Sequence, residues 1–263
     1  MASHIAHYFF GKRILTLLPD AAQAVAQKYE AHFLIGNQGP DIFFFALPYR
    51  ADNLGSRIHA ESLSKLLRQN RGWIRYSDRN NPTWAYLLGL LCHFSLDISL
   101  HPFIDRIEDR VALDHMTMER ELDRAVLEEE GIDPLRFVSR DILPHPDKVA
   151  DAIVPVYGRY EGGDIHPVRS ALFSFRLVEM LFHVSSPGAY DRKMRLLRLL
   201  GMQKSFGGKL MHDKGFFESR YITTPALMTR MRLAYPVAVE AIEALYEGED
   251  AYPPFFDLNF SGV

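Results

Sequence analysis

The chain has 263 residues, of which 48% are hydrophobic and 24% are charged, a composition typical of a soluble globular protein. Its formal net charge of −3 argues against a nucleic-acid-binding protein, which would need a basic surface for phosphate contacts. The single cysteine, Cys92, excludes an internal disulfide framework and favours a reducing compartment.

We expect one multi-helical, all-α domain over residues 1–263, because apolar residues recur at three- and four-residue spacing and no segment alternates convincingly. One predicted helix begins at the Asn81-Pro82 capping pair and ends near Leu100, since Pro102 discourages continuation. Residues 207–224 form the most loop-like stretch. In chain order, the predicted helices span residues 19–36, 57–69, 82–100, 116–130, 147–160, 168–183, 191–200 and 225–247.

The N-terminus predicts no export signal, because it has neither an early basic residue nor an unbroken apolar stretch of signal-peptide length. The longest apolar run, residues 85–96, is interrupted by His93 and stopped by Asp97, so it reads as a buried helix. We therefore expect a cytoplasmic protein with no transmembrane segment, and export by another route stays open.

The candidate metal-binding side chains are concentrated in residues 1–125. Among them, His93, Asp97 and His101 are spaced four residues apart. This spacing places the three side chains on one face of an otherwise apolar helix. Burying a carboxylate and two imidazoles there would cost free energy unless another group interacts with them. Divalent metal ions can do so, because imidazole and carboxylate are typical zinc donors. The carboxylate in the middle can bridge two metals.

Three further pieces of sequence add metal donors to this motif. His115 and Glu119 form a second pair at four-residue spacing, weak alone but credible so close to His101. Asp41 precedes an apolar run in which an unpaired charge would be awkward, and His59 sits early on its helix. Taken singly, Asp41 is interpreted as a turn residue or helix N-cap, and His59 as a surface or core-edge histidine.

Together these segments resemble the zinc-dependent phospholipase C family, whose architecture is shared by single-strand-specific zinc nucleases. The central H-x-x-x-D-x-x-x-H-P pattern is the strongest part of the resemblance. The segments that carry it are HYFFG (7–11), GPDIFF (39–44), His59, GLLCHFSLDISLHPFI (89–104) and His115 with Glu119.

The resemblance implies a cluster of about two to three Zn²⁺ ions. The implied ligand sets are Asp41, His59, His93 and Asp97 for one zinc, His101, His115 and Glu119 for a second, and Asp97 and His7 for a third. In secreted members the N-terminal amine and carbonyl complete the third set. Here we expect His4, or the amine of Ala2 after removal of Met1, to replace the amine.

The resemblance further implies hydrolysis of a phosphodiester or phospholipid head group by a zinc-activated water. Asp41 is either the general base for that water or only a ligand. Two alternatives stay open: a single-strand nuclease, against which the acidic net charge counts, and a zinc-binding protein without turnover. Oligomeric state is not predicted.

Residues 126–263 are expected to be a helical scaffold without metal ligands, because His145, His166, His183 and His212 form no motif like those at residues 93–101 and 115–119. Their apolar stripes should pack against the metal-bearing helices. These stripes consist of Leu172, Phe175, Leu177 and Leu181, and of Leu227, Met231, Leu233 and Val237.

Overall fold

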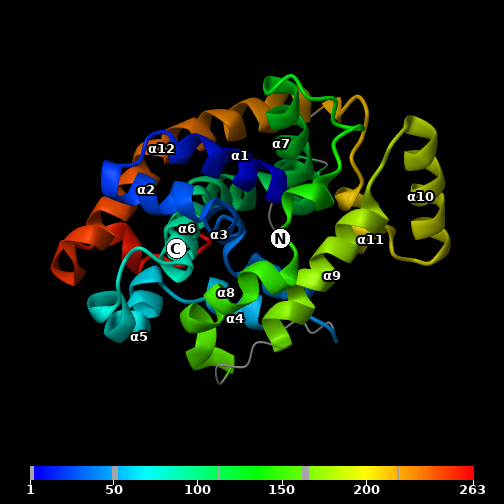
Figure 1. Ribbon diagram of the computed structural model, residues 1–263. Coiled ribbons are helices and arrows are strands. Elements are labelled where there is room, and N and C mark those ends of the chain that lie inside the picture. Colours follow the sequence, from blue (N-terminus) through cyan, green and yellow to red (C-terminus); the bar gives the residue numbers. More distant parts are fainter. Residues whose placement is uncertain (1–2, 49–52, 112, 162–165, 218) are drawn as a thin grey trace.

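The computed structural model describes residues 3–48, 53–111, 113–161, 166–217 and 219–263 (Figure 1). Throughout these residues the regular structure is helical, and the only β-type pairing described is an isolated bridge between Ser62 and Asn259. The predicted all-α class is therefore confirmed. The single-domain organisation stays a prediction.

Helices of different length make up the fold, with short 3₁₀ turns between them. The α-helices are α1 (His4–Leu15), α2 (Asp20–Lys28), α3 (Glu30–Gly36), α4 (Leu54–His59), α5 (Leu63–Tyr76), α6 (Pro82–Ile107), α7 (His115–Glu129), α8 (Pro146–Glu161), α9 (His166–Phe182), α10 (Pro187–Leu199), α11 (Gln203–Phe206) and α12 (Thr224–Glu247). The turns that matter below are η1 (Gly39–Phe45) and η4 (Gly207–Lys209).

Helix α6 is the central element, and α1, α3, α8 and α12 all contact it (Figure 1). Its side chains from Trp84 to Asp97 are all buried, as expected for a helix that is apolar on every side. The span Pro82–Arg110 is long and apolar enough to cross a membrane by length and composition, yet 78% of its apolar window is buried inside the protein. The buried-helix interpretation is therefore confirmed.

Two glycines allow α3 and α6 to approach each other closely. A Cβ on Gly89 would lie 2.0 Å from the backbone oxygen of Phe33, and one on Gly36 would lie 2.3 Å from that of Tyr86. Helix α3 leads directly into η1, which carries Asp41. The close approach therefore fixes the position of Asp41 relative to α6.

The predicted end of α6 near Leu100 is wrong, because the helix continues through Pro102 to Ile107. Proline leaves the carbonyl of Ile98 without its helical partner. The C-terminal turn packs at this point, where a Cβ on Gly262 would lie 3.2 Å from Ile98 O and 2.7 Å from Pro102 Cγ. Tertiary packing thus stabilises a continuation that local sequence disfavours.

Two other predicted helices are each divided in the structure. Residues 19–36 form α2 and α3, separated at Tyr29, whose φ of −118° and ψ of 44° are not helical. Residues 57–69 belong to α4 and α5, and the side chain of Ser62 caps the second by accepting a hydrogen bond from the Lys65 N–H. Because of this break, His59 is the last residue of α4, and its Nε2 lies 2.9 Å from Oδ1 of Asp41.

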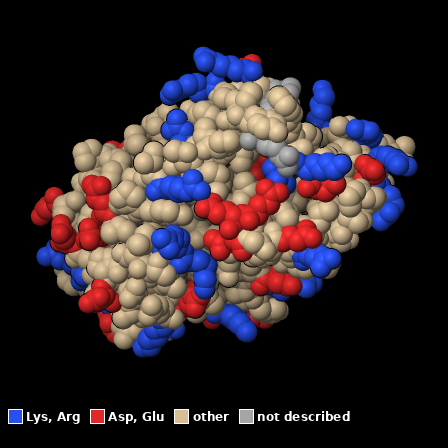
Figure 2. Space-filling model, turned by 90° about the horizontal axis from the view of Figure 1, so that it is seen from above, with Lys and Arg blue, Asp and Glu red and all other residues tan. Residues whose placement is uncertain are grey.

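The expected packing of the C-terminal stripes is correct for some residues and wrong for others. Leu172 and Phe175 are buried, whereas Leu177 and Leu181 are 37% and 56% exposed. On α12, Leu233 is also exposed, at 66%. Helix α10 lies at the edge of the molecule, beyond α9 (Figure 1). Figure 2 shows acidic side chains near the middle of one face and basic side chains toward the end that α10 occupies.

Candidate metal centre

The candidate centre is built on one face of α6. His93, Asp97 and His101 follow one another at four-residue spacing, so each side chain lies one helical turn from the next. All three are buried, and Asp97 is only 1% exposed. An ionised carboxylate at this depth needs close positive or polar neighbours.

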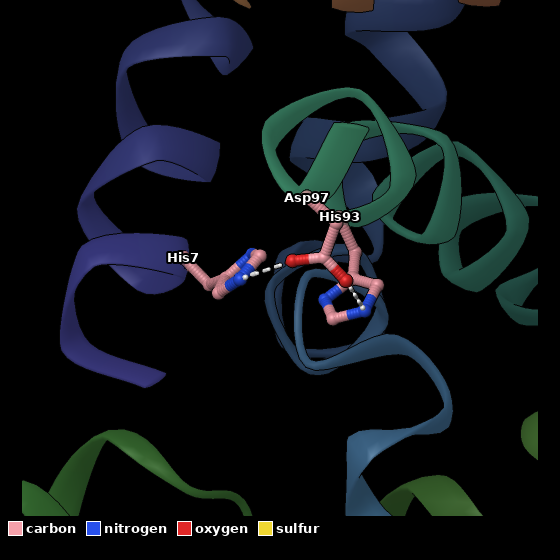
Figure 3. A group of neighbouring side chains, drawn as sticks. All are labelled: His7, His93 and Asp97. Carbon is pink, nitrogen blue, oxygen red and sulfur yellow. Dashed lines mark ion pairs between the residues drawn. The ribbon is translucent and has the colours of Figure 1, made fainter. Parts of the chain in front are cut away.

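Asp97 lies at the centre of four imidazoles. Its Oδ1 is 3.2 Å from Nε2 of His7 and 3.8 Å from Nε2 of His101. Its Oδ2 is 3.0 Å from Nε2 of His93 and 3.7 Å from Nε2 of His59. Figure 3 shows His7 reaching from α1 to one carboxylate oxygen while His93 contacts the other. One carboxylate therefore faces side chains from α1, α4 and α6.

The potential ligand atoms fall into groups whose members lie within 4.8 Å of one another. Three groups contain all eight of the predicted ligands: His7, His93 and Asp97; Asp41, His59 and His93; and His101, His115 and Glu119. In the second group Asp41 Oδ1 lies 2.9 Å from His59 Nε2. In the third, Glu119 Oε1 lies 3.2 Å from His115 Nε2 and 3.6 Å from His101 Nε2. The structure thus brings the predicted residues together, and their role as zinc ligands stays a prediction.

Backbone carbonyls orient three of the imidazoles. A carbonyl oxygen only accepts, so a ring nitrogen bonded to it carries the proton and leaves the other nitrogen with its lone pair. The Nδ1 atoms of His59, His93 and His101 donate to Gly55 O at 2.7 Å, Asn37 O at 3.1 Å and Phe260 O at 2.9 Å, respectively. In each ring Nε2 is then free to coordinate a metal, the arrangement that such outer contacts give metal-bound histidines.

Two buried atoms in the centre show that a cation fits there. Nε2 of His93 and Oδ2 of Asp97 lie 3.0 Å apart, yet neither has a hydrogen bond of acceptable geometry within the part of the chain that the structure describes. Imidazole nitrogen and carboxylate oxygen are typical zinc donors, and a cation between them would satisfy both. The residues present therefore fit zinc.

In the metal-free protein, protons compete for the same positions. Burial acts to raise the pKa of Asp97, but His93 and His101 hold this pKa well below its usual range. Burial likewise opposes ionisation of Asp41, yet its contact with His59 lowers the pKa of Asp41 to about 2. Both carboxylates are consequently ionised at neutral pH and available as ligands.

The zinc dependent phospholipase C family matches residues 6–157, which is more than half of the chain and includes all eight residues of the three implied ligand sets. The chain belongs to this family. Searches of curated proteins and of solved structures give no match.

In the N-terminal region, His4 does not lie with the predicted zinc ligands. Its Nε2 lies 3.1 Å from Oε2 of Glu179, and its Nδ1 lies 4.0 Å from Oδ2 of Asp123. The imidazoles of His4 and His7 are both buried on α1, but His4 contacts Glu179 whereas His7 contacts Asp97. The expectation that His4 completes the third ligand set is therefore not supported. The alternative, the amine of Ala2, lies outside the described residues.

Sequence reasoning missed the second cluster, which joins α1, α7 and α9. Oδ1 of Asp123 accepts the N–H of Ala6 at 2.8 Å, and Arg120 lies 3.2 Å from the other carboxylate oxygen. Ser139 donates to Glu179 at 2.8 Å. This cluster anchors the first turn of α1 and so positions His7. Glu179 was not noticed because its partners His4, Arg120 and Ser139 are far away in the sequence, and contacts of that kind leave no local pattern.

Proposed function

We propose that this family member is a zinc-dependent phosphodiester hydrolase that acts on phospholipid head groups. The observation that supports the proposal most is the position of Asp97 between His7, His59, His93 and His101, with carbonyl contacts that direct three imidazoles inward. Bound zinc would supply a water acidified toward neutral pH and positive charge for the phosphoryl oxygens.

The residues of the chain would hold and orient this chemistry. Asp97 would hold two metals because its two oxygens face different imidazoles. His101, His115 and Glu119 would hold another, close to the surface, since the His115 side chain is 28% exposed. The more exposed side chains of His59 and His115 mark the side from which a substrate can approach.

Asp41 has two possible roles, and one variant separates them. Asp41→Asn retains the side-chain shape but is a weaker ligand and cannot accept a proton from water. If Asp41 is the general base for the water, this variant should be inactive while its zinc content is unchanged. If Asp41 is a zinc ligand, the zinc content of the variant should fall together with its activity. Elemental analysis and initial rates on the same preparation give both quantities.

Hydrolysis of a generic phosphodiester by the zinc-loaded protein tests the proposal. Turnover that disappears with chelator and returns with zinc supports it, whereas a zinc-loaded protein without turnover indicates a zinc-binding protein instead. Comparing lecithin with single-stranded DNA then distinguishes a phospholipase from a nuclease. Cytoplasmic location stays a prediction, which cell fractionation would test.

A further inference from the structure

Helices α9 and α10 each expose large apolar side chains that nothing in the described chain covers. We call these side chains together the α9–α10 surface. Its apolar members on α9 recur every three to four residues, so they form one stripe. The members are Phe173, Leu177, Met180 and Leu181 on α9, and Leu196, Leu199, Leu200 and Met202 at the end of α10.

Helix α10 is apolar on two sides, and only one side is packed. Its inner residues, Ala189, Met194 and Leu197, are buried in a small cluster with Val184 and Leu210. On the outer side Leu199 is 84% exposed. A leucine that stays in water does not stabilise the fold. Moving it into an apolar phase would raise the equilibrium constant for binding that phase roughly tenfold for each side chain. Exposed apolar side chains in this number, next to a polar rim, are typical of an interaction site.

The charge around these leucines identifies the kind of partner. Between residues 187 and 206 the sequence has five basic residues and one acidic residue, Asp191, although the whole chain is net negative. Four of the basic side chains are exposed: Arg192, Arg195, Arg198 and Lys204. The fifth, Lys193, donates to the carbonyl of His183 at 2.7 Å and joins α10 to the end of α9. The basic side chains at one end of the molecule in Figure 2 lie toward α10.

We propose that the α9–α10 surface docks on an anionic lipid bilayer. The leucines would enter the boundary between head groups and acyl chains, and the arginines would contact lipid phosphates. A second copy of this chain is a poorer partner, because a symmetric contact would bring two basic surfaces together.

The position of the surface suits the metal centre. On the inner side of α9, the ring of Phe175 stacks on that of Phe45 with 4.0 Å between centroids. Phe45 ends η1, the turn that contains Asp41. Only the thickness of α9 thus separates the apolar stripe from the turn that carries a predicted ligand. The docking proposal itself uses no metal ligand and does not depend on hydrolysis.

Co-sedimentation of the full zinc-loaded protein with vesicles tests the proposal. The vesicles consist of phosphatidylcholine alone or of phosphatidylcholine with phosphatidylglycerol, and released head group is measured separately from bound protein. We expect binding to the anionic vesicles that weakens as salt is added, because exposed charges are screened. Binding without release of head group would support docking and contradict the proposed hydrolysis. Release of head group without measurable binding would support hydrolysis and contradict docking.

Two double variants and their matched controls locate the surface. Leu199→Ser with Leu200→Ser should weaken binding on the order of 100-fold. Arg195→Gln with Arg198→Gln should weaken it roughly 30-fold, from about fivefold per charge, and reduce its salt dependence. Leu233→Ser on α12, and Arg71→Gln with Arg75→Gln on α5, change exposed residues elsewhere and should bind like the parent.

Circular dichroism and zinc content must be unchanged in the variants that are compared. The proposal is overturned if the parent protein ignores anionic vesicles, or if the α10 variants bind as well as their controls. It is equally overturned if the parent is a dimer that the leucine variants dissociate, because the surface would then be a subunit interface.

Discussion

Replacing Asp97 by alanine should remove more zinc than any other single change of a carboxylate. Its Oδ1 lies 3.8 Å from Nε2 of His101 and its Oδ2 lies 3.7 Å from Nε2 of His59, so this carboxylate contacts a histidine from each of the ligand groups beside its own. Glu119 is the matched control, because it is also a buried carboxylate but its histidine contacts, His101 and His115, both belong to its own group. Asp97→Ala should therefore lose more than one zinc equivalent, and Glu119→Ala about one.

The thermodynamic effect follows from the number of sites lost. With free zinc at 100 times its dissociation constant, each site stabilises the folded state by about 2.7 kcal/mol. Loss of two sites removes about 5 kcal/mol, which lowers the melting temperature of a chain of this size by roughly 10–20 °C. Loss of one site lowers it by roughly 5–10 °C.

The assay compares each variant with its own chelated form, so that the cost of the truncated side chain cancels. Elemental analysis gives zinc per chain, and thermal unfolding with and without chelator gives the zinc-dependent shift. Equal zinc losses and equal shifts in Asp97→Ala and Glu119→Ala would refute the bridging role of Asp97.

Three other predictions test the scaffold around the centre. His183→Ala and His212→Ala should leave zinc content unchanged by elemental analysis, and loss of a full equivalent from either would require a new ligand set. Gly89→Ala should lower the unfolding free energy by about 3 kcal/mol in denaturant titrations, because its Cβ would lie 2.0 Å from Phe33 O; an unchanged midpoint would contradict this close approach. Burial raises the pKa of Asp123 to about 6 although Arg120 opposes it, so its protonated form stabilises the fold fully below about pH 4 and this contribution disappears as pH rises through 6. Asp123→Asn in chelator should lack this loss of about 3 kcal/mol between pH 4 and 6, and a pH profile that matches the parent would show that another group is responsible.

Helical spacing in the sequence was sufficient to predict which side chains share a face. His93, Asp97 and His101 lie on one side of α6 as expected, and so do His115 and Glu119 on α7. This works because the period of an α-helix is fixed by backbone geometry and does not depend on tertiary contacts. The resemblance to a family supplied the order of the more distant predicted ligands.

Spacing could not show how neighbouring helices are rotated toward one another. His4 and His7 are one turn apart on α1, yet one faces Glu179 and the other faces Asp97. The carbonyl of Phe260 orients His101 from the far end of the chain, and a backbone carbonyl leaves no signal in a sequence. The exposed stripe of α9 was missed for a similar reason, since periodicity identifies an apolar face without showing whether it is covered.

The contrast between the two buried clusters is the strongest physical argument for metal. Asp123 is satisfied by protein groups alone, because it accepts an N–H from Ala6 and pairs with Arg120. Asp97 is buried as deeply, but its ion-pair partners in the described residues are all histidines, and its Oδ2 makes no hydrogen bond there. Histidines are weaker permanent cations than arginine, because their charge disappears above their pKa. A buried carboxylate surrounded only by imidazoles is therefore better explained by a shared metal ion than by a structural ion pair.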